Sequence, residues 1–278
     1  MRFILAALLT SLLNTVSPAQ SYDYIAPSAY TTFASYSDGK SSSDLSLYVS
    51  HNISPLWHGT ANLGVLQVSD QGWSYPQYTA GYHAAYYYFP LTVKLDLQYL
   101  QGNFSYKQDK SYDYSDHTRL GGFDLLYYYN DMYFGASYTY LSANGVIGED
   151  SLSGLHSHQA ALRFVYIFSY DLSVTLRPAA SILSDGRKLY SLYGRVNYQP
   201  APEIILKAGG FTGERAYYYD TDLFVLFNQN ATQKYQLFAQ ADYIFSPAYG
   251  FSLGYQHTKF NGFSINYYIA GIKTYFTI

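Results

Sequence analysis

The sequence contains no cysteine. Disulfide bonds, thiolate metal sites, a cysteine nucleophile and a lipid-bearing cysteine at the N-terminus of a mature chain are therefore excluded. Charge is also scarce: charged residues make up 13% of the chain and the formal net charge is -3, which gives no reason to expect binding to nucleic acid. The mean hydropathy of -0.13 is far too polar for a protein that crosses a membrane with helices.

Only one long apolar run occurs, and it lies at the N-terminus. Arg2 precedes an apolar stretch over residues 3–13, and the tripeptide Ser-Pro-Ala at 17–19 gives the small-x-small pattern of a cleavage site. The run is too short for a membrane helix. We predict that residues 1–19 are a signal peptide and that residues 20–278 form a single domain.

What the chain does have is a repeated alternation of apolar and polar residues. From Leu91 to Tyr99, every odd position is apolar and every even position is polar. Side chains in a strand point to opposite faces with a period of two, so this segment is predicted to be a strand with one wholly apolar face. The same pattern predicts fourteen strands, at residues 24–36, 43–53, 57–68, 77–89, 91–104, 117–129, 132–142, 156–168, 172–183, 187–199, 203–214, 234–245, 251–260 and 264–277.

Short and long connections alternate between these segments. Short turns on one side and longer loops on the other are typical of outer-membrane barrels, and an even number of strands puts both chain ends on the short-turn side. We therefore predict an all-β fold, a transmembrane antiparallel up-and-down β-barrel of about fourteen strands. Turn signals occur near 54–56, 89–90, 130–131, 169–171, 200–202 and 246–250, and polar loops lie at 37–42, 69–76, 107–116, 143–154, 184–186, 215–233 and 261–263.

Loop 215–233 leaves the strand count open. It contains the apolar run 223–227, which can add a hairpin to the wall and give sixteen strands, or fold inward as a plug. Twelve strands would result if two of the weaker segments failed to pair.

The apolar rows of the predicted strands have a composition suited to lipid. They contain no charged residue, and many end in Tyr or Phe near the turns, like the aromatic girdle of membrane barrels. A soluble β-sandwich would show the same alternation, and β-propensity alone can raise the number of tyrosines, which is 36. The length of the rows favours the membrane barrel. They run, at every second residue, over Leu45–Val49, Tyr78–Tyr88, Phe134–Tyr140, Leu162–Phe168 and Tyr235–Phe245.

The last predicted strand carries a resemblance to a known class of protein. Ala270, Ile272, Thr274, Phe276 and Ile278 form its outward row. This row resembles the C-terminal signal strand of Gram-negative outer-membrane barrels, although Ile278 stands where those proteins have Phe or Trp. The resemblance implies a bacterial outer-membrane location, contact with outer-membrane lipid and lipopolysaccharide, and recognition by the barrel assembly machinery. Length and Tyr-rich hairpins are also similar to those of small YaiO-type barrels and of polysaccharide-export barrels, and no motif assigns the chain to either.

The predicted inward rows hold the most informative charges. Arg163 and Arg177 lie about six residues on either side of the turn at 169–171, and Arg195 and Lys207 flank the turn near 201 in the same way. Because a strand rises about 3.3 Å per residue, four consecutive strands are predicted to bring these cations to nearly one height in the lumen. The other predicted lumen selectivity residues at this height are Asp96, Asp124, Asp242 and Lys273, with His83 and Asn62 beside them.

A basic arc of this kind predicts a porin-like passive channel for small anionic or polyhydroxylated solutes. The alternative is a closed structural or scaffold barrel, in which inward Arg and Asp neutralise one another and inward tyrosines narrow the lumen. Such a barrel would bind a partner protein or surface ligand through its extracellular loops, with Leu223, Phe224 and Phe227 as contact candidates. The width of a fourteen-strand barrel does not decide between the channel and the closed barrel, since eight strands give a filled interior and sixteen or more a water channel. The inward tyrosines are Tyr48, Tyr87, Tyr128, Tyr133, Tyr193 and Tyr267.

We predict that the chain is not an enzyme. Some outer-membrane barrels are hydrolases, and His257 and Asn266 face outward on neighbouring predicted strands. A serine nucleophile on the next outward row would complete a hydrolase-like trio. That row offers Ala239 and Ala241 instead.

No cofactor or metal is predicted either. His156 and His158 lie near Glu149 and Asp150 at a loop, and we interpret the histidines as solvated rim residues rather than metal ligands. The sequence has no phosphate loop, zinc-ligand spacing or nucleophile elbow.

Overall fold

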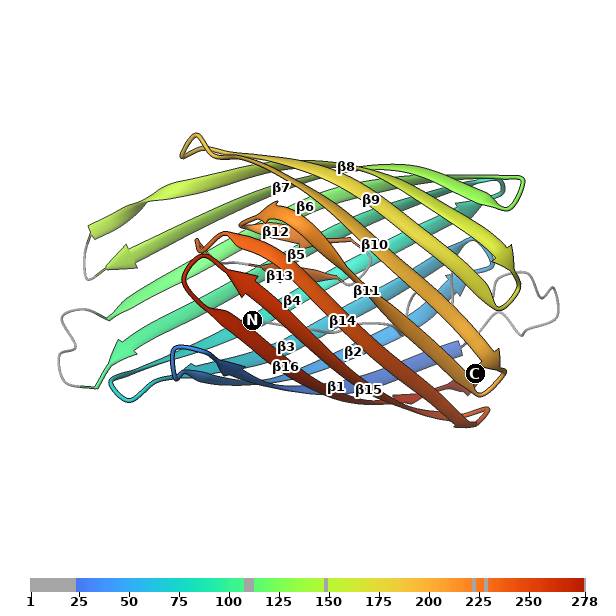
Figure 1. The fold of residues 1–278 in the computed structure, drawn as a ribbon, viewed down its shortest axis with the longest axis horizontal. Helices are drawn as coiled ribbons and strands as arrows, with labels where there is room; N and C mark the ends of the chain where they lie inside the picture. The colour runs from blue at the N-terminus through green and yellow to red at the C-terminus, as the bar shows by residue number, and fades with distance from the viewer. Residues whose placement is uncertain (1–23, 108–112, 148–149, 222–223, 228–229, 278) are drawn as a thin grey trace.

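The computed structural model describes residues 24–107, 113–147, 150–221, 224–227 and 230–277, so the predicted signal peptide lies outside the described residues. Fourteen antiparallel strands form a closed barrel, in which β16 completes the ring by pairing with β1 (Figure 1). The short β17 (Phe276–Thr277) continues β16 along β1. The predicted strand number and topology are confirmed. The wall strands are β1 (Tyr24–Tyr36), β2 (Ser41–Ser54), β3 (Trp57–Ser69), β4 (Trp73–Tyr88), β5 (Leu91–Tyr106), β6 (Tyr114–Tyr129), β7 (Met132–Ile147), β8 (Asp150–Ser169), β9 (Leu172–Leu183), β10 (Lys188–Ala201), β11 (Ile204–Arg215), β14 (Gln233–Ser246), β15 (Tyr249–Phe260) and β16 (Ser264–Thr274).

No helix in the described ranges is long and apolar enough to cross a membrane.

The turn between β6 and β7 illustrates how the sequence sets the short connections. Asn130 and Asp131 both have positive φ, at 45° and 61°. Asn and Asp tolerate this left-handed backbone better than most residues, and two such residues in succession give a turn whose twist matches that of the flanking strands. The turn predicted at these two residues is confirmed.

The two faces of the wall have the predicted polarity. Apolar side chains at alternate positions are exposed on the outside, for example Leu97 at 63% and Leu162 at 52%. Residues between them point into the barrel and are buried, including Asp96 and Arg163. An apolar outside and a polar inside is the arrangement of a transmembrane barrel and the reverse of a soluble sheet protein. The soluble-sandwich alternative is therefore wrong.

Several wall strands run further toward the loop end than the sequence indicates. β4 begins at Trp73 and β6 at Tyr114, inside the predicted loops 69–76 and 107–116. Period-two alternation marks only the part of a strand that faces lipid, whereas the backbone ladder needs no apolar face. Strand ends beyond the lipid consequently look like polar loops in the sequence.

Two further strands lie inside the barrel rather than in its wall. β12 (Tyr218–Asp220) and β13 (Val225–Phe227) form a separate two-stranded sheet, and every residue in them is buried. Figure 1 shows both within the outline of the wall strands. The sixteen-strand alternative is therefore wrong, and the loop folds inward. We call β12, β13 and the described residues Thr221 and Phe224 between them the lumen hairpin.

Candidate functional site

The cations predicted to line the lumen all point inward and are buried. Arg163 and Arg177 lie opposite each other across the β8–β9 pair. Arg177 on β9 lies opposite Tyr193 on β10, so Arg195, two residues further along β10, is its diagonal neighbour. Lys207 on β11 lies opposite Asn197 and is the diagonal neighbour of Arg195. The four cations thus form a stepped arc rather than a level ring, because strands in a closed barrel are staggered. The other predicted lumen residues, Asp96, Asp124, Asp242 and Lys273, are also buried.

β8 and β9 hold one side of the lumen hairpin. The Gln159 amide donates to the carbonyl oxygen of Tyr219 (2.8 Å) and accepts from its N–H (3.0 Å), so one side chain satisfies both backbone groups of a hairpin residue. Arg177 Nη2 donates to Asp220 Oδ2 at 2.5 Å. Arg163 Nη2 donates to Thr221 Oγ1 at 2.9 Å. A buried polar group costs free energy unless it is hydrogen-bonded, so these contacts define the seated position of the hairpin.

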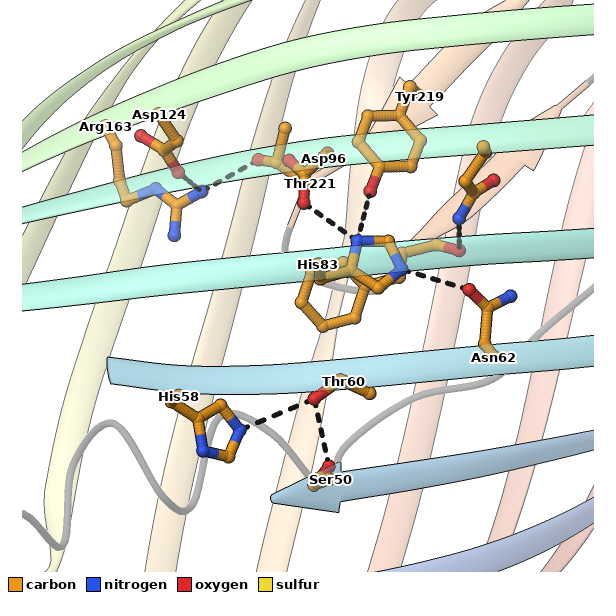
Figure 2. A network of polar contacts seen from close by, with 12 residues as sticks. Ser50, His58, Thr60, Asn62, His83, Asp96, Asp124, Arg163, Tyr219 and Thr221 are labelled. Carbon is orange, nitrogen blue, oxygen red and sulfur yellow. Dashed lines mark hydrogen bonds and ion pairs between the residues drawn. The ribbon is translucent and has the colours of Figure 1, made fainter. Parts of the chain in front are cut away.

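β4 and β5 hold the other side through a histidine (Figure 2). His83 Nδ1 lies 2.8 Å from Asp96 Oδ1 and 3.3 Å from the Tyr219 hydroxyl. Phe224 packs its ring on the same imidazole, with 3.7 Å between centroids, and its carbonyl oxygen accepts from Gln98 Nε2 at 2.8 Å. His83 Nε2 also lies 3.2 Å from Asn62 Oδ1. The hydrogen bonds of the hairpin therefore lie along one arc of the ring, from β4 to β9. Its apolar side chains reach the far wall, where Tyr218, Val225 and Phe227 cluster with Tyr30, Tyr48 and Tyr267 of β1, β2 and β16.

Arg215 fixes the point where the chain leaves the wall for the hairpin. Its guanidinium lies over the rings of Phe211 and Tyr218, at 3.9 Å and 4.1 Å from their centroids, and Nε donates to Ser191 Oγ at 2.9 Å. Cation–π contacts of this kind contribute about 2 kcal/mol or more when they are desolvated. Arg215 is the last residue of β11, so this cluster sets the angle at which the hairpin enters.

The remaining lumen charges are neutralised unevenly. Asp124 Oδ2 accepts from Arg163 at 2.8 Å. Asp242 serves two ammonium groups, Lys207 at 2.8 Å and Lys273 at 3.4 Å. In the described ranges no carboxylate lies within ion-pair distance of Arg195, and its Nε and Nη1 have no hydrogen-bond partner there. Every cation of the arc is less than a twentieth exposed, so these side chains are shielded from water.

The loop end of the barrel is hollow above the hairpin. A cavity of about 470 Å³ opens there. Its aromatic side includes Trp73, Phe104 and Tyr114, with 4.9 Å between successive ring centroids. Asp116 faces it too and accepts a hydrogen bond from the Tyr75 hydroxyl. We call this cavity the vestibule; its floor consists of hairpin residues Leu226 and Phe227 and of Tyr217.

The residues proposed as partner contacts do not lie on an outer surface. Phe227 is buried, and Phe224 packs on His83 inside the lumen. Leu223 lies outside the described residues. The apolar run fills the barrel because its side chains lose more water-exposed area there than on a loop surface.

The outward histidines contact aromatic and amide groups. His257 Nδ1 lies 2.8 Å from Asn266 Oδ1, and the ring of Tyr235 stands next to it. His158 and His156 contact the hydroxyls of Tyr138 and Tyr140, at 2.7 Å and 2.9 Å. Glu149 and the side chain of Asp150 lie outside the described residues, and the described residues contain no group of three or more possible metal ligands.

Sequence reasoning placed Arg163, Arg177 and His83 in the lumen but missed the other residues that hold the hairpin. Asp220 and Thr221 lie in a loop with no alternation, and Gln159 is a neutral residue on an ordinary inward row. The available signal was the length of loop 215–233 together with its Tyr-Tyr-Tyr-Asp stretch, in which an acid follows three residues with large aromatic rings. Such a segment is costly to leave in water and needs a cation when it is buried.

No protein-family model matches the sequence, and no curated protein matches it. Solved structures do. The toluene transporter TbuX of Ralstonia pickettii superimposes with a TM-score of 0.59 at 11% identity, over 100% of this chain and 96% of that one. The toluene transporter TodX of Pseudomonas putida gives 0.56 at 11%, over 95% and 92%. CymD, a monoaromatic hydrocarbon channel, gives 0.56 at 13%, over 99% and 94%.

These likenesses show the fold. The chain has the closed antiparallel barrel of Gram-negative outer-membrane proteins, as its alternation and C-terminal strand predicted.

Proposed function

We propose that this chain is a passive outer-membrane channel for small anionic or polyhydroxylated solutes, and that its own lumen hairpin closes it. The observation that carries the proposal is the hairpin. Every residue of β12 and β13 is buried, yet the backbone ladder joins these strands only to each other in the described ranges. The similarity to barrels named as transporters and channels supports the transport part.

Side chains, and not a backbone ladder, hold the hairpin to the wall. Its polar contacts come from Gln159, Arg177, Arg163, His83 and Gln98. Its apolar side chains also pack on wall residues, for example Leu226 in a cluster with Leu100 and Leu141. A neutral hydrogen bond contributes about 0.5–1.5 kcal/mol net, and a two-stranded hairpin on its own is marginally stable. Displacing this hairpin therefore breaks far fewer backbone bonds than removing any wall strand.

Displacement would also change the charge of the lumen. Asp220 leaves with the hairpin, and Arg177 then loses this ion pair. Asp124 and Asp242 remain on the wall beside Arg163 and Lys207. The opened lumen would therefore present Arg177 and Arg195 to water, and a ring with excess positive charge favours anions.

Single-channel recording in a planar bilayer tests this proposal. We expect rare openings from the wild-type barrel and steady conductance with anion preference when residues 218–227 are replaced by a Gly-Ser linker of equal length. Adding Arg177→Ala and Arg195→Ala to the linker variant should reduce the anion preference. Asp38→Asn, at an exposed pair with Lys40 on a rim turn, is the matched control and should behave as wild type.

Two results would contradict the proposal. A linker variant that folds, as judged by heat-modifiable migration, but does not conduct would contradict the proposed channel. A conducting linker variant whose ion selectivity is unchanged by the two arginine substitutions would contradict the proposed role of the basic arc in selectivity.

The scaffold alternative has less support. Its contact candidates Phe224 and Phe227 are enclosed by the barrel, so a partner would have to bind other parts of the loops.

A further inference from the structure

We infer that the lumen contains an anion-binding site centred on Arg195, which takes a small oxyanion such as a carboxylate or a phosphate. The inference rests on the proposed function and deepens it, because it names the chemical group that the lumen of the proposed channel recognises.

The first argument is the state of Arg195 itself. Its side chain is 3% exposed, and within the described ranges Nε and Nη1 lack a hydrogen-bond partner. Arg stays protonated in proteins, so this guanidinium cannot avoid its burial cost by losing a proton. A buried charge without a counter-charge is destabilising, whereas an oxyanion matches the planar donor fork of Arg with two parallel hydrogen bonds.

The second argument is the charge around Arg195. Lys207 lies one diagonal step away and is close enough for the two cations to repel each other. Its carboxylate partner, Asp242, is shared with Lys273. Three cations therefore lie near one carboxylate on this side of the lumen, and a bound anion would reduce the excess positive charge.

The third argument is what lies directly across from Arg195 on both neighbouring strands. On β9 the opposite residue is Thr175, which is 1% exposed and whose hydroxyl has no hydrogen-bond partner among the described residues. On β11 the opposite residue is Gly209, which has no side chain to offer. The site thus has a guanidinium fork, a hydroxyl donor and a nearby ammonium group, and no acceptor from β11 opposes an incoming oxyanion.

Thermal unfolding of the detergent-folded full chain tests the inference without any measurement of conductance. The probes are sodium phosphate, sodium acetate and sodium chloride at equal ionic strength. We expect phosphate or acetate to raise the unfolding temperature of the wild-type protein by several degrees and in a saturable way, because a ligand that binds only the folded state stabilises it.

Arg195→Met distinguishes this site from general salt effects. A methionine fills similar apolar space without a charge, so the variant should unfold at a higher temperature than the wild type at low phosphate and acetate, and it should lose the oxyanion-dependent rise. Lys234→Met is the control, because Lys234 pairs with Glu214 at the rim and is partly exposed. It should keep the full rise.

Three outcomes would overturn the inference: no rise with any anion, an equal rise with chloride and with the oxyanions, or an equal oxyanion rise in Arg195→Met. These shifts in unfolding temperature can be measured whether or not the barrel conducts. A silent but oxyanion-stabilised barrel would reject the channel and keep the site.

Discussion

The two flanks of the lumen carry similar cations and neutralise them in different ways. On the flank formed by β8 and β9, the carboxylate that contacts Arg177 is Asp220, which belongs to the hairpin. On the flank formed by β10, β11 and β14–β16, the carboxylate is Asp242, which belongs to the wall and contacts Lys207 and Lys273. The first acid sits on a segment held by side chains, and the second on a strand paired on both sides.

This difference assigns separate tasks to chemically similar pairs. An ion pair between two wall strands stabilises the barrel in every state of the hairpin. An ion pair between wall and hairpin stabilises only the closed state, because its two charges separate when the hairpin leaves. Substitutions on the two flanks should therefore affect different measurements, and three predictions test this in order of expected effect.

The largest effect is expected for Asp242→Asn. The substitution leaves the buried ammonium groups of Lys207 and Lys273 without this carboxylate, and the Ser252 hydroxyl loses its 2.5 Å bond to the charged oxygen. Breaking a buried pair from one side costs about 3–5 kcal/mol. We expect the unfolding temperature, followed by the heat-induced shift in gel migration, to fall clearly. The opening frequency in bilayer recordings should be unchanged.

Asp44→Asn is a useful comparison, because Asp44 is a buried inward acid on β2 that accepts from Ser46. A fall in unfolding temperature no larger than for Asp44→Asn would contradict a special structural role for Asp242.

The second effect is expected for Asp220→Asn and has the opposite signature. The wall pairs remain, so the barrel should unfold at nearly the wild-type temperature. The seated hairpin loses its charged bond to Arg177, and charge-assisted bonds contribute about 1.5–3 kcal/mol. We expect the open fraction in bilayer recordings to rise about tenfold or more, since about 1.4 kcal/mol is a factor of ten.

Gln159→Leu should act in the same direction, because it removes both bonds to the backbone of Tyr219. If Asp220→Asn lowered the unfolding temperature as much as Asp242→Asn and left the open fraction unchanged, the contrast between the flanks would be refuted.

The sequence predicts the wall well because lipid imposes a simple rule on it. Each wall residue faces either lipid or lumen, so alternation locates the fourteen wall segments, the apolar rows and the inward position of residues such as Arg163 and Asp124. It does not decide whether residues 223–227 join the wall, because that run does not alternate. The same rule stops at the edge of the lipid, and this explains why the starts of β4 and β6 look like loops.

The pairing of the lumen charges could not be predicted in the same way. The stagger between neighbouring strands decides which inward residues meet. Counting residues from a predicted turn does not reveal this stagger. Asp96 shows this: it is predicted at one height with the four cations, yet the residue directly opposite it on β4, with which it pairs, is His83. Asp220 shows a second reason, since it reaches Arg177 through the fold of a loop 43 residues away in sequence.

The smallest effect is expected at the rim, where Arg187 contacts the chain that returns from the hairpin. Its Nη1 and Nη2 donate to the backbone and side-chain oxygens of Asn230, at 2.8 Å and 2.7 Å, while Nε donates to Asp185 at 2.7 Å. The bond from Arg187 lowers the pKa of Asp185. A lowered pKa in the folded state means that the stabilisation is present at neutral pH and is lost as the pH falls through that pKa. Acid should therefore free Arg187 from Asp185 and loosen its hold on Asn230.

Because the pair is exposed, we expect the opening frequency to rise less than about fivefold between about pH 6 and about pH 3, in line with contributions of about 1 kcal/mol or less. Asp185→Asn should open at pH 6 at least as often as the wild type does at pH 3, because the lowered pKa leaves part of the wild-type carboxyl ionised at pH 3, and it should show a weaker pH dependence. Identical pH dependence in the two proteins would show that this rim contact does not influence the hairpin.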